Sequence, residues 1–182
     1  MNGGRDAGEP QAEGHGGRLP PVLGSGWLWL PLAIAVIGVD QLSKAWIVSH
    51  MAYGGIRTLL PVLDITLRYN RGAAWSMLDS ASGWQRWLFS GLAVVVGAGL
   101  VYWLRRINGR TQVLLSVSLS LILAGALGNL IDRLHSGQVV DFILAHWNDA
   151  QFPAFNVADS AITVGAALML LDAFTEGRRR SN

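Results

Sequence analysis

Four stretches of the sequence are apolar over about the length of a membrane-spanning helix. They run from Trp27 to Val48, from Trp84 to Leu104, from Val113 to Ile131 and from Val157 to Phe174. A helix needs roughly 20 mainly apolar residues to cross the hydrocarbon core of a bilayer. The second and third stretches are apolar on every side, which is typical of helices surrounded by lipid. The sequence therefore predicts an all-α integral membrane protein with four transmembrane helices.

The positions of the basic residues predict the orientation of these helices. Four spans place both termini on one side, where eight arginines lie: Arg5, Arg18, Arg105, Arg106, Arg110, Arg178, Arg179 and Arg180. The first loop on the opposite side holds three: Arg57, Arg68 and Arg71. Short cytoplasmic loops are enriched in Lys and Arg. Both termini are therefore expected to be cytoplasmic, with loops 49–83 and 132–156 on the outer side.

The segments outside the spans differ in character. Residues 1–26 are rich in Gly and have no apolar period, so we expect a disordered cytoplasmic tail. It is not expected to be a cleaved signal peptide, because the apolar run that follows exceeds the usual 7–15 residues. A membrane domain is predicted over 27–176 and a basic cytoplasmic tail over 177–182. Within loop 49–83, Ile65, Leu67 and Tyr69 alternate with polar residues, which predicts a strand in a small extracytoplasmic β-sheet.

Polar residues at membrane depth are the first candidates for a functional site, because they are costly there. The chain has no cysteine, so thiolate nucleophiles and Cys-type zinc sites are excluded. Asp40 and Lys44 share a helix face and can form an ion pair, which could also serve only to neutralise two charges. Gly72, in Asn70-Arg71-Gly72, permits either a close approach to a ligand or a simple turn.

The end of the third span carries a second polar face. Gly125, Asn129 and Arg133 recur at helical spacing, so they lie on one side. Ala124 and Gly128 are small enough for close helix packing, but packing does not explain Asn129 or Arg133.

Two carboxylates flank the start of the fourth span. Asp159 lies in the expected first turn of that helix, where Asn156 or nearby backbone can cap the helix and the helix dipole favours an anion. Asp141 interrupts a short apolar run from Val139 to Ala145, and a carboxylate buried there needs a partner.

Five sequence blocks occur in the order found in bacterial lipoprotein signal peptidases (signal peptidase II), a family that the chain resembles from Asp40 to Ser160. The blocks are DQLSK, NRGAAWS, AGALGNLIDR, VVDFI and FNVADS. The resemblance implies an aspartic endopeptidase of the bacterial inner membrane that cleaves diacylglyceryl-modified prolipoproteins just before the lipidated cysteine. It also implies inhibition by globomycin and contact with membrane lipids. We expect no cofactor, no metal and no nucleic-acid partner.

Carried over by position, the resemblance makes Asp141 and Asp159 the catalytic pair. The supporting residues that it implies are Asp40, Lys44, Asn70, Gly72, Gly125, Asn129, Arg133, Asn156 and Ala158. The sequence departs from the family pattern where Trp75 replaces the usual Phe and where Ala124 replaces a Gly. Two close carboxyls share one proton and titrate as a unit, and the sequence leaves open which of them starts as the base.

Three other functions remain open from the residues alone. Ser43 and Lys44 could form a Ser-Lys hydrolase, although adjacent helical residues point apart. A proton-coupled carrier could use a relay of carboxylates formed by Asp40, Asp132, Asp141 and Asp159. His135 or His146 could join an Asp at a metal site, although the two histidines lack ligand spacing.

Overall fold

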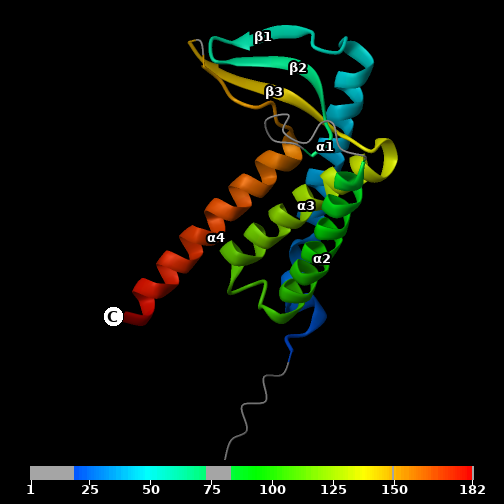
Figure 1. The fold of residues 1–182 in the computed structure, drawn as a ribbon. Helices are drawn as coiled ribbons and strands as arrows, with labels where there is room; N and C mark the ends of the chain where they lie inside the picture. Colours follow the sequence, from blue (N-terminus) through cyan, green and yellow to red (C-terminus); the bar gives the residue numbers. More distant parts are fainter. Residues whose placement is uncertain (1–18, 73–82, 149, 182) are drawn as a thin grey trace, which may run out of the picture.

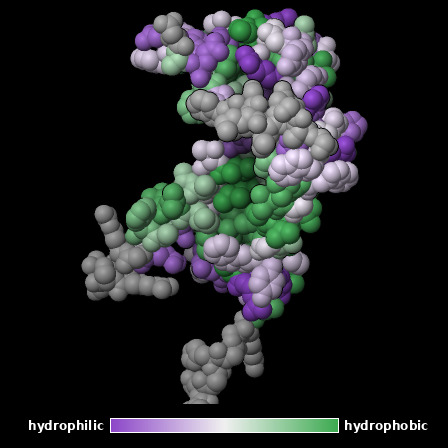
Figure 2. Space-filling view, in the orientation of Figure 1, coloured by the Kyte–Doolittle hydropathy of each residue, from purple (hydrophilic) through white to green (hydrophobic). Residues whose placement is uncertain are grey.

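The computed structural model describes residues 19–72, 83–148 and 150–181. It contains four long helices: α1 (Leu30–His50), α2 (Trp84–Arg106), α3 (Val113–Ser136) and α4 (Val157–Ser181). Each is long and apolar enough to cross a membrane, so the four predicted spans are confirmed. Figure 2 shows hydrophobic residues over the helical part and hydrophilic residues gathered at both ends. This distribution suits helices that meet lipid along their sides.

Helix α3 organises the bundle because it packs against α1, α2 and α4. Leu119 and Leu123 of α3 form a buried apolar cluster with Leu100 and Leu104 of α2 and with Ile107. Figure 1 shows α4 diverging from the other helices toward its carboxyl end. The helices are thus held most closely where α4 begins.

The segment before α1 is partly structured. Two short 3₁₀ turns, η1 (Val22–Gly24) and η2 (Gly26–Trp29), lead into α1. Ser25 pairs with Asn108 in an isolated bridge, and Gly26 lies against Leu104. The end of the tail expected over 1–26 is therefore ordered by contacts with the α2–α3 connection, while residues 1–18 lie outside the described residues. Helix α4 also continues past the expected boundary at residue 176.

An antiparallel sheet covers one end of the bundle. Its strands are β1 (Ile56–Leu60), β2 (Leu63–Asn70), β3 (Val139–Trp147) and β4 (Ala150–Gln151), in that order across the sheet. The strand predicted from alternation in loop 49–83 is β2. The apolar run that contains Asp141 is also a strand, β3, which lies between β2 and β4.

The sheet and the helices are joined by a second apolar cluster. Leu67 of β2 and Phe142 of β3 pack against Ile47 near the end of α1. In Figure 1 the sheet lies across the end of the bundle where α1 and α3 finish and α4 starts. The chain therefore brings β3, the last turns of α1 and α3, and the first turn of α4 to one place.

Candidate active site

Asp141 lies in the middle of the sheet and is almost completely buried. It pairs with Arg68 in the β2–β3 register, and its exposed fraction is 3%. Asn70 of β2 donates to Asp141 Oδ2 from Nδ2 at 3.1 Å. Asn156 donates to Asp141 Oδ1 from Nδ2 at 2.8 Å. The partners that a buried carboxylate needs are thus two amide side chains rather than a cation.

Asp159 lies in the first turn of α4 and is half-buried. Its Oδ1 accepts a hydrogen bond of 2.7 Å from Asn129 Nδ2. Its Oδ2 accepts from the backbone N–H of Asn156 at 3.2 Å, and the Asp159 N–H donates to Asn156 Oδ1 at 2.9 Å. This reciprocal pair is a capping box, so the expectation that Asn156 caps the helix is confirmed.

Asn156 connects the two carboxylates. Its side chain contacts Asp141 and its backbone N–H contacts Asp159, and the residue is fully buried. The two aspartates are 18 positions apart in the sequence, and the chain returns to β3 before α4 begins, because Phe155 forms a bridge with Ile143 of β3. The two carboxylates predicted to form a pair therefore meet around one asparagine.

The environment of Asp141 raises its pKa to about 7 from the usual 3.8. Burial is the largest cause, because it disfavours the charged form, and the negative charge of Asp159 acts in the same direction. Hydrogen bonds from Asn70 and Asn156 and the charge of Lys44 oppose the rise. Near neutral pH, Asp141 therefore retains a proton for a substantial part of the time.

Lys44 is buried in a ring of acceptors. Its Nζ lies 2.7 Å from Asp40 Oδ2 and 2.9 Å from Asp132 Oδ2, and it donates to Asn129 Oδ1 at 3.1 Å. The predicted pair of Asp40 with Lys44 is confirmed. Ser43 instead donates its hydroxyl to the backbone oxygen of Asp40 at 2.8 Å. The arrangement does not favour a Ser-Lys nucleophile, because Lys44 is held by other groups.

The small residues of the expected site allow backbones to approach closely. A Cβ on Gly125 would collide with the backbone oxygen of Ala158, so α3 and α4 can meet there only through glycine. Ala158 is fully buried, and its N–H donates to Asp40 Oδ1 at 2.8 Å. Gly72 has a φ of 100° and donates its N–H to Asn70 Oδ1 at 2.8 Å. This turn holds the Asn70 side chain that contacts Asp141.

Arg133 lies at the edge of this cluster. Its guanidinium stacks over the Phe89 ring at 5.2 Å, and Nη1 donates to the backbone oxygen of Asn129 at 3.4 Å. It interacts electrostatically with Asp159, Asp132 and Asp141. Among the described residues, no salt bridge ties the Arg133 guanidinium to a carboxylate, which leaves it able to orient a ligand.

An apolar groove runs beside Asp159. Its volume is about 460 Å³, and it is lined by Phe152, Pro153, Ala154, Phe155, Asp159, Ser160, Thr163 and Val164. Asp159 is the only charged side chain in that lining. Trp75, where the sequence departs from the family pattern, lies outside the described residues.

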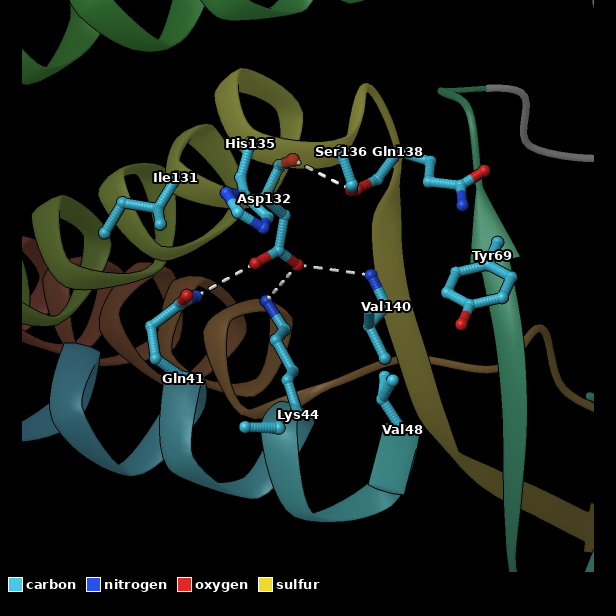
Figure 3. A pocket seen from close by; sticks show the side chains of 11 residues that line it. Gln41, Lys44, Val48, Tyr69, Ile131, Asp132, His135, Ser136, Gln138 and Val140 are labelled. Atoms are coloured by element: carbon cyan, nitrogen blue, oxygen red, sulfur yellow. Dashed lines mark hydrogen bonds and ion pairs between the residues drawn. The ribbon is translucent and has the colours of Figure 1, made fainter. Parts of the chain in front are cut away.

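Asp132 belongs to the group of side chains around Lys44. From the sequence alone it was considered only as part of a possible proton relay. Its Oδ1 accepts from Gln41 Nε2 at 2.9 Å, and its Oδ2 accepts from the backbone N–H of Val140 at 3.1 Å (Figure 3). Asp132 lies three residues after Asn129, so helical spacing already placed both on neighbouring positions. The contact with Val140 crosses from α3 to β3 and has no signature in the sequence.

The histidines lie apart from the aspartate pair. His146 Nε2 is 3.3 Å from Asp64 Oδ2, whereas His135 lines a separate pocket beside Asp132 (Figure 3). Among the described residues, no group of three His, Asp or Glu side chains is arranged to hold a metal ion.

Comparisons with known proteins agree on one family. The family model for signal peptidase (SPase) II matches residues 32–175. A lipoprotein signal peptidase of Pseudomonas fluorescens is 51% identical over 167 residues, which cover 91% of this chain and 93% of the relative. Its counterpart in Pseudomonas aeruginosa is 50% identical over 160 residues, with 87% and 89% covered.

Solved structures show the same likeness. A bacterial membrane enzyme solved by the in meso method at 2.3 Å resolution matches with a TM-score of 0.73 and 34% identity, over 83% of this chain and 90% of that one. A second such structure, at 1.9 Å resolution, gives a TM-score of 0.71 and 35% identity, over 80% and 91%.

Proposed function

Because the chain belongs to the signal peptidase II family, we propose that it cleaves diacylglyceryl-modified prolipoproteins just before the lipidated cysteine, with Asp141 and Asp159 as the catalytic pair. The observation that carries this assignment is the contact of Asn156 with both carboxylates. Peptide hydrolysis needs a base that activates water and an acid that protonates the departing groups. Two carboxyls in unlike surroundings can divide these tasks.

Asp159 is proposed to start as the base and Asp141 as the acid. Asp159 sits at the amino end of α4, where the helix dipole favours its anion, and it lines the open groove. Asp141 is buried, its pKa is raised to about 7, and both of its described partners are neutral amides. The pair then holds one proton, mainly on Asp141, in the resting enzyme.

The reaction follows from this division. Asp159 accepts a proton from water while the water oxygen attacks the scissile carbonyl carbon, and Asp141 gives its proton to the carbonyl oxygen. The resulting gem-diol collapses as Asp159 returns its proton to the leaving nitrogen and Asp141 recovers one from a hydroxyl. Both carboxyls end in their starting states, so no further proton source is required.

Substrate positioning is assigned to the groove and to Arg133. The apolar lining beside Asp159 suits an extended peptide with small apolar side chains, and the Arg133 guanidinium can donate to its carbonyl groups. Lys44, Asp40, Asn70, Asn129, Asn156, Gly72, Gly125 and Ala158 are proposed to support the pair rather than to contact substrate.

The proposed location is the bacterial inner membrane, with both termini cytoplasmic and the sheet on the outer side. Arg105 and Arg106 end α2 at the pole opposite the sheet, which agrees with the enrichment of basic residues in cytoplasmic loops. A diacylglyceryl chain resists leaving the bilayer by about 0.8 kcal/mol per buried methylene. A site at the membrane boundary therefore meets both the anchored substrate and water, in contact with membrane lipids.

Cleavage of a purified lipidated prolipoprotein tests the proposal. We expect wild-type protein to release the signal peptide, with inhibition by globomycin and with activity that persists in chelators and needs no added cofactor or nucleic acid. An unlipidated substrate of the same sequence should be cleaved far more slowly. Absence of cleavage by folded wild-type protein, or proton flux into liposomes without proteolysis, would refute the proposal.

A further inference from the structure

The two carboxylates that flank Lys44, Asp40 and Asp132, each accept a hydrogen bond from a backbone N–H next to the aspartate pair. Asp40 Oδ1 accepts from the N–H of Ala158 at 2.8 Å, and Ala158 directly precedes Asp159. Asp132 Oδ2 accepts from the N–H of Val140 at 3.1 Å, and Val140 directly precedes Asp141. Each carboxylate therefore fixes the residue before one member of the aspartate pair.

Lys44 ties these two carboxylates together. Its Nζ lies 2.7 Å from Asp40 and 2.9 Å from Asp132, and all three side chains are at most 7% exposed. Figure 3 shows Lys44 and Gln41 of α1 pointing toward Asp132, with Val140 on its other side. Opposite charges in such dry surroundings attract each other more strongly than those at a surface.

The geometry points to a positioning device, the Lys44 clamp (Asp40, Lys44 and Asp132), that sets the separation of Asp141 and Asp159, with Asp132 as a positioning residue for the reaction. This inference rests on the proposed function of the pair. Asp132 touches neither carboxylate of the pair in any described hydrogen bond and acts through the Val140 amide.

The local backbone explains why both amides need an outside acceptor. Ala158 occupies the first turn of α4, where N–H groups have no partner within the helix. Val140 follows directly on the first residue of β3, and its N–H turns to Asp132. Without these acceptors the two segments that carry Asp141 and Asp159 would be joined by Asn156 and by the backbone hydrogen bonds of Phe155 to β3. Misplacement of a catalytic group by about 1 Å can cost on the order of 100-fold in rate.

Two alanine variants test the clamp by separate readouts. Asp132→Ala should speed hydrogen exchange of the Val140 amide at least about tenfold and leave the Ala158 amide within about twofold of wild type. Asp40→Ala should have the reverse effect. In both variants Lys44 keeps one carboxylate and Asn129, so neither leaves the buried cation without a partner. Asp172→Asn, a carboxylate change elsewhere in α4, is the control and should leave both amides unchanged.

Kinetics complete the test. Asp132→Ala should lower kcat at least about tenfold while KM stays within about twofold, because the defect lies in the alignment of the pair and not in the groove. Asp132→Asn, which keeps one acceptor oxygen, should recover part of kcat and serves also if the alanine variant does not fold. The inference is overturned if Val140 stays protected in Asp132→Ala, if either variant loosens both amides equally, or if kcat stays within twofold of wild type. The exchange experiments need no substrate, so they remain decisive even if wild-type protein fails to cleave prolipoprotein.

Discussion

Replacing Asp141 with Asn is expected to stabilise the folded protein at alkaline pH while it abolishes cleavage. The carboxyl is 3% exposed and its pKa is about 7, so the folded state resists its ionisation. Asn has nearly the same shape and carries no charge at any pH. The variant thus removes the ionisation cost together with the proposed acid.

The size of the effect follows from proton linkage. The unfolded chain loses this proton near pH 3.8 and the folded protein near pH 7, so between these values the folded state binds one proton more. The free energy of unfolding of wild type should therefore fall by about 1.4 kcal/mol per pH unit in that window. Over about three units the loss is about 4 kcal/mol, absent below pH 4 and complete above pH 7.

The substitution also has a cost that does not depend on pH. The Asn side chain has one acceptor oxygen, so one of the two hydrogen bonds from Asn70 and Asn156 is lost, at about 1 kcal/mol. Asp141→Asn should therefore be slightly less stable than wild type at pH 4 and more stable by about 3 kcal/mol at pH 8, the difference of the two estimates.

Unfolding in detergent, followed from pH 4 to pH 9, measures this crossover. Asp172→Asn removes a carboxylate from α4 outside the site and should keep the wild-type pH profile. If the free energy of unfolding depended on pH in the same way for wild type and Asp141→Asn, Asp141 would ionise freely in the folded state. The physical basis for assigning it as the acid would then be removed.

Three further outcomes are expected. Asp159→Asn should abolish cleavage of lipidated prolipoprotein while the amount of protein in the membrane is unchanged; measurable turnover in that variant would remove Asp159 as the base. Arg133→Ala should raise KM several-fold and retain some turnover, since its guanidinium is assigned to substrate orientation; wild-type kinetics would remove Arg133 from the site. Gly125→Val should lower both thermal stability and kcat, because the new side chain meets the Ala158 backbone oxygen, whereas Gly99→Val, at an open position, should do neither.

The helical part of the fold was predictable because the bilayer imposes a strong constraint on length and polarity. The sheet was predictable only in part. Alternation revealed β2, but β3 reads as a continuous apolar run from Val139 to Ala145 that is broken only by Asp141. A central strand covered on both faces has no period of two, so its identity depends on the partners that the fold supplies.

The candidate site shows the same division between local and long-range information. Spacing along the chain was enough to expect the Asp40–Lys44 pair and the Asn156 cap. The contact of Asp132 with the Val140 amide joins a helix to a strand across a turn, and the contact of Asn129 with Asp159 joins two helices. Neither contact can be predicted from periodicity. From the sequence, only the five ordered motifs indicated that Asn129 and Asp159 belong to one site.

The placement of the one buried lysine explains how a carboxyl can serve as an acid here. Lys44 is committed to Asp40 and Asp132, and its charge lowers the pKa of Asp141 only as the last of the described causes. A cation bonded directly to Asp141 would stabilise its anion and remove the proton that the proposed mechanism requires. The fold instead gives Asp141 neutral amide partners and uses the lysine to hold the backbone on both sides of the pair. Asp141 therefore keeps its raised pKa, because the ammonium group that could lower it further is bound by Asp40 and Asp132 and forms no hydrogen bond with Asp141 in the described part of the chain.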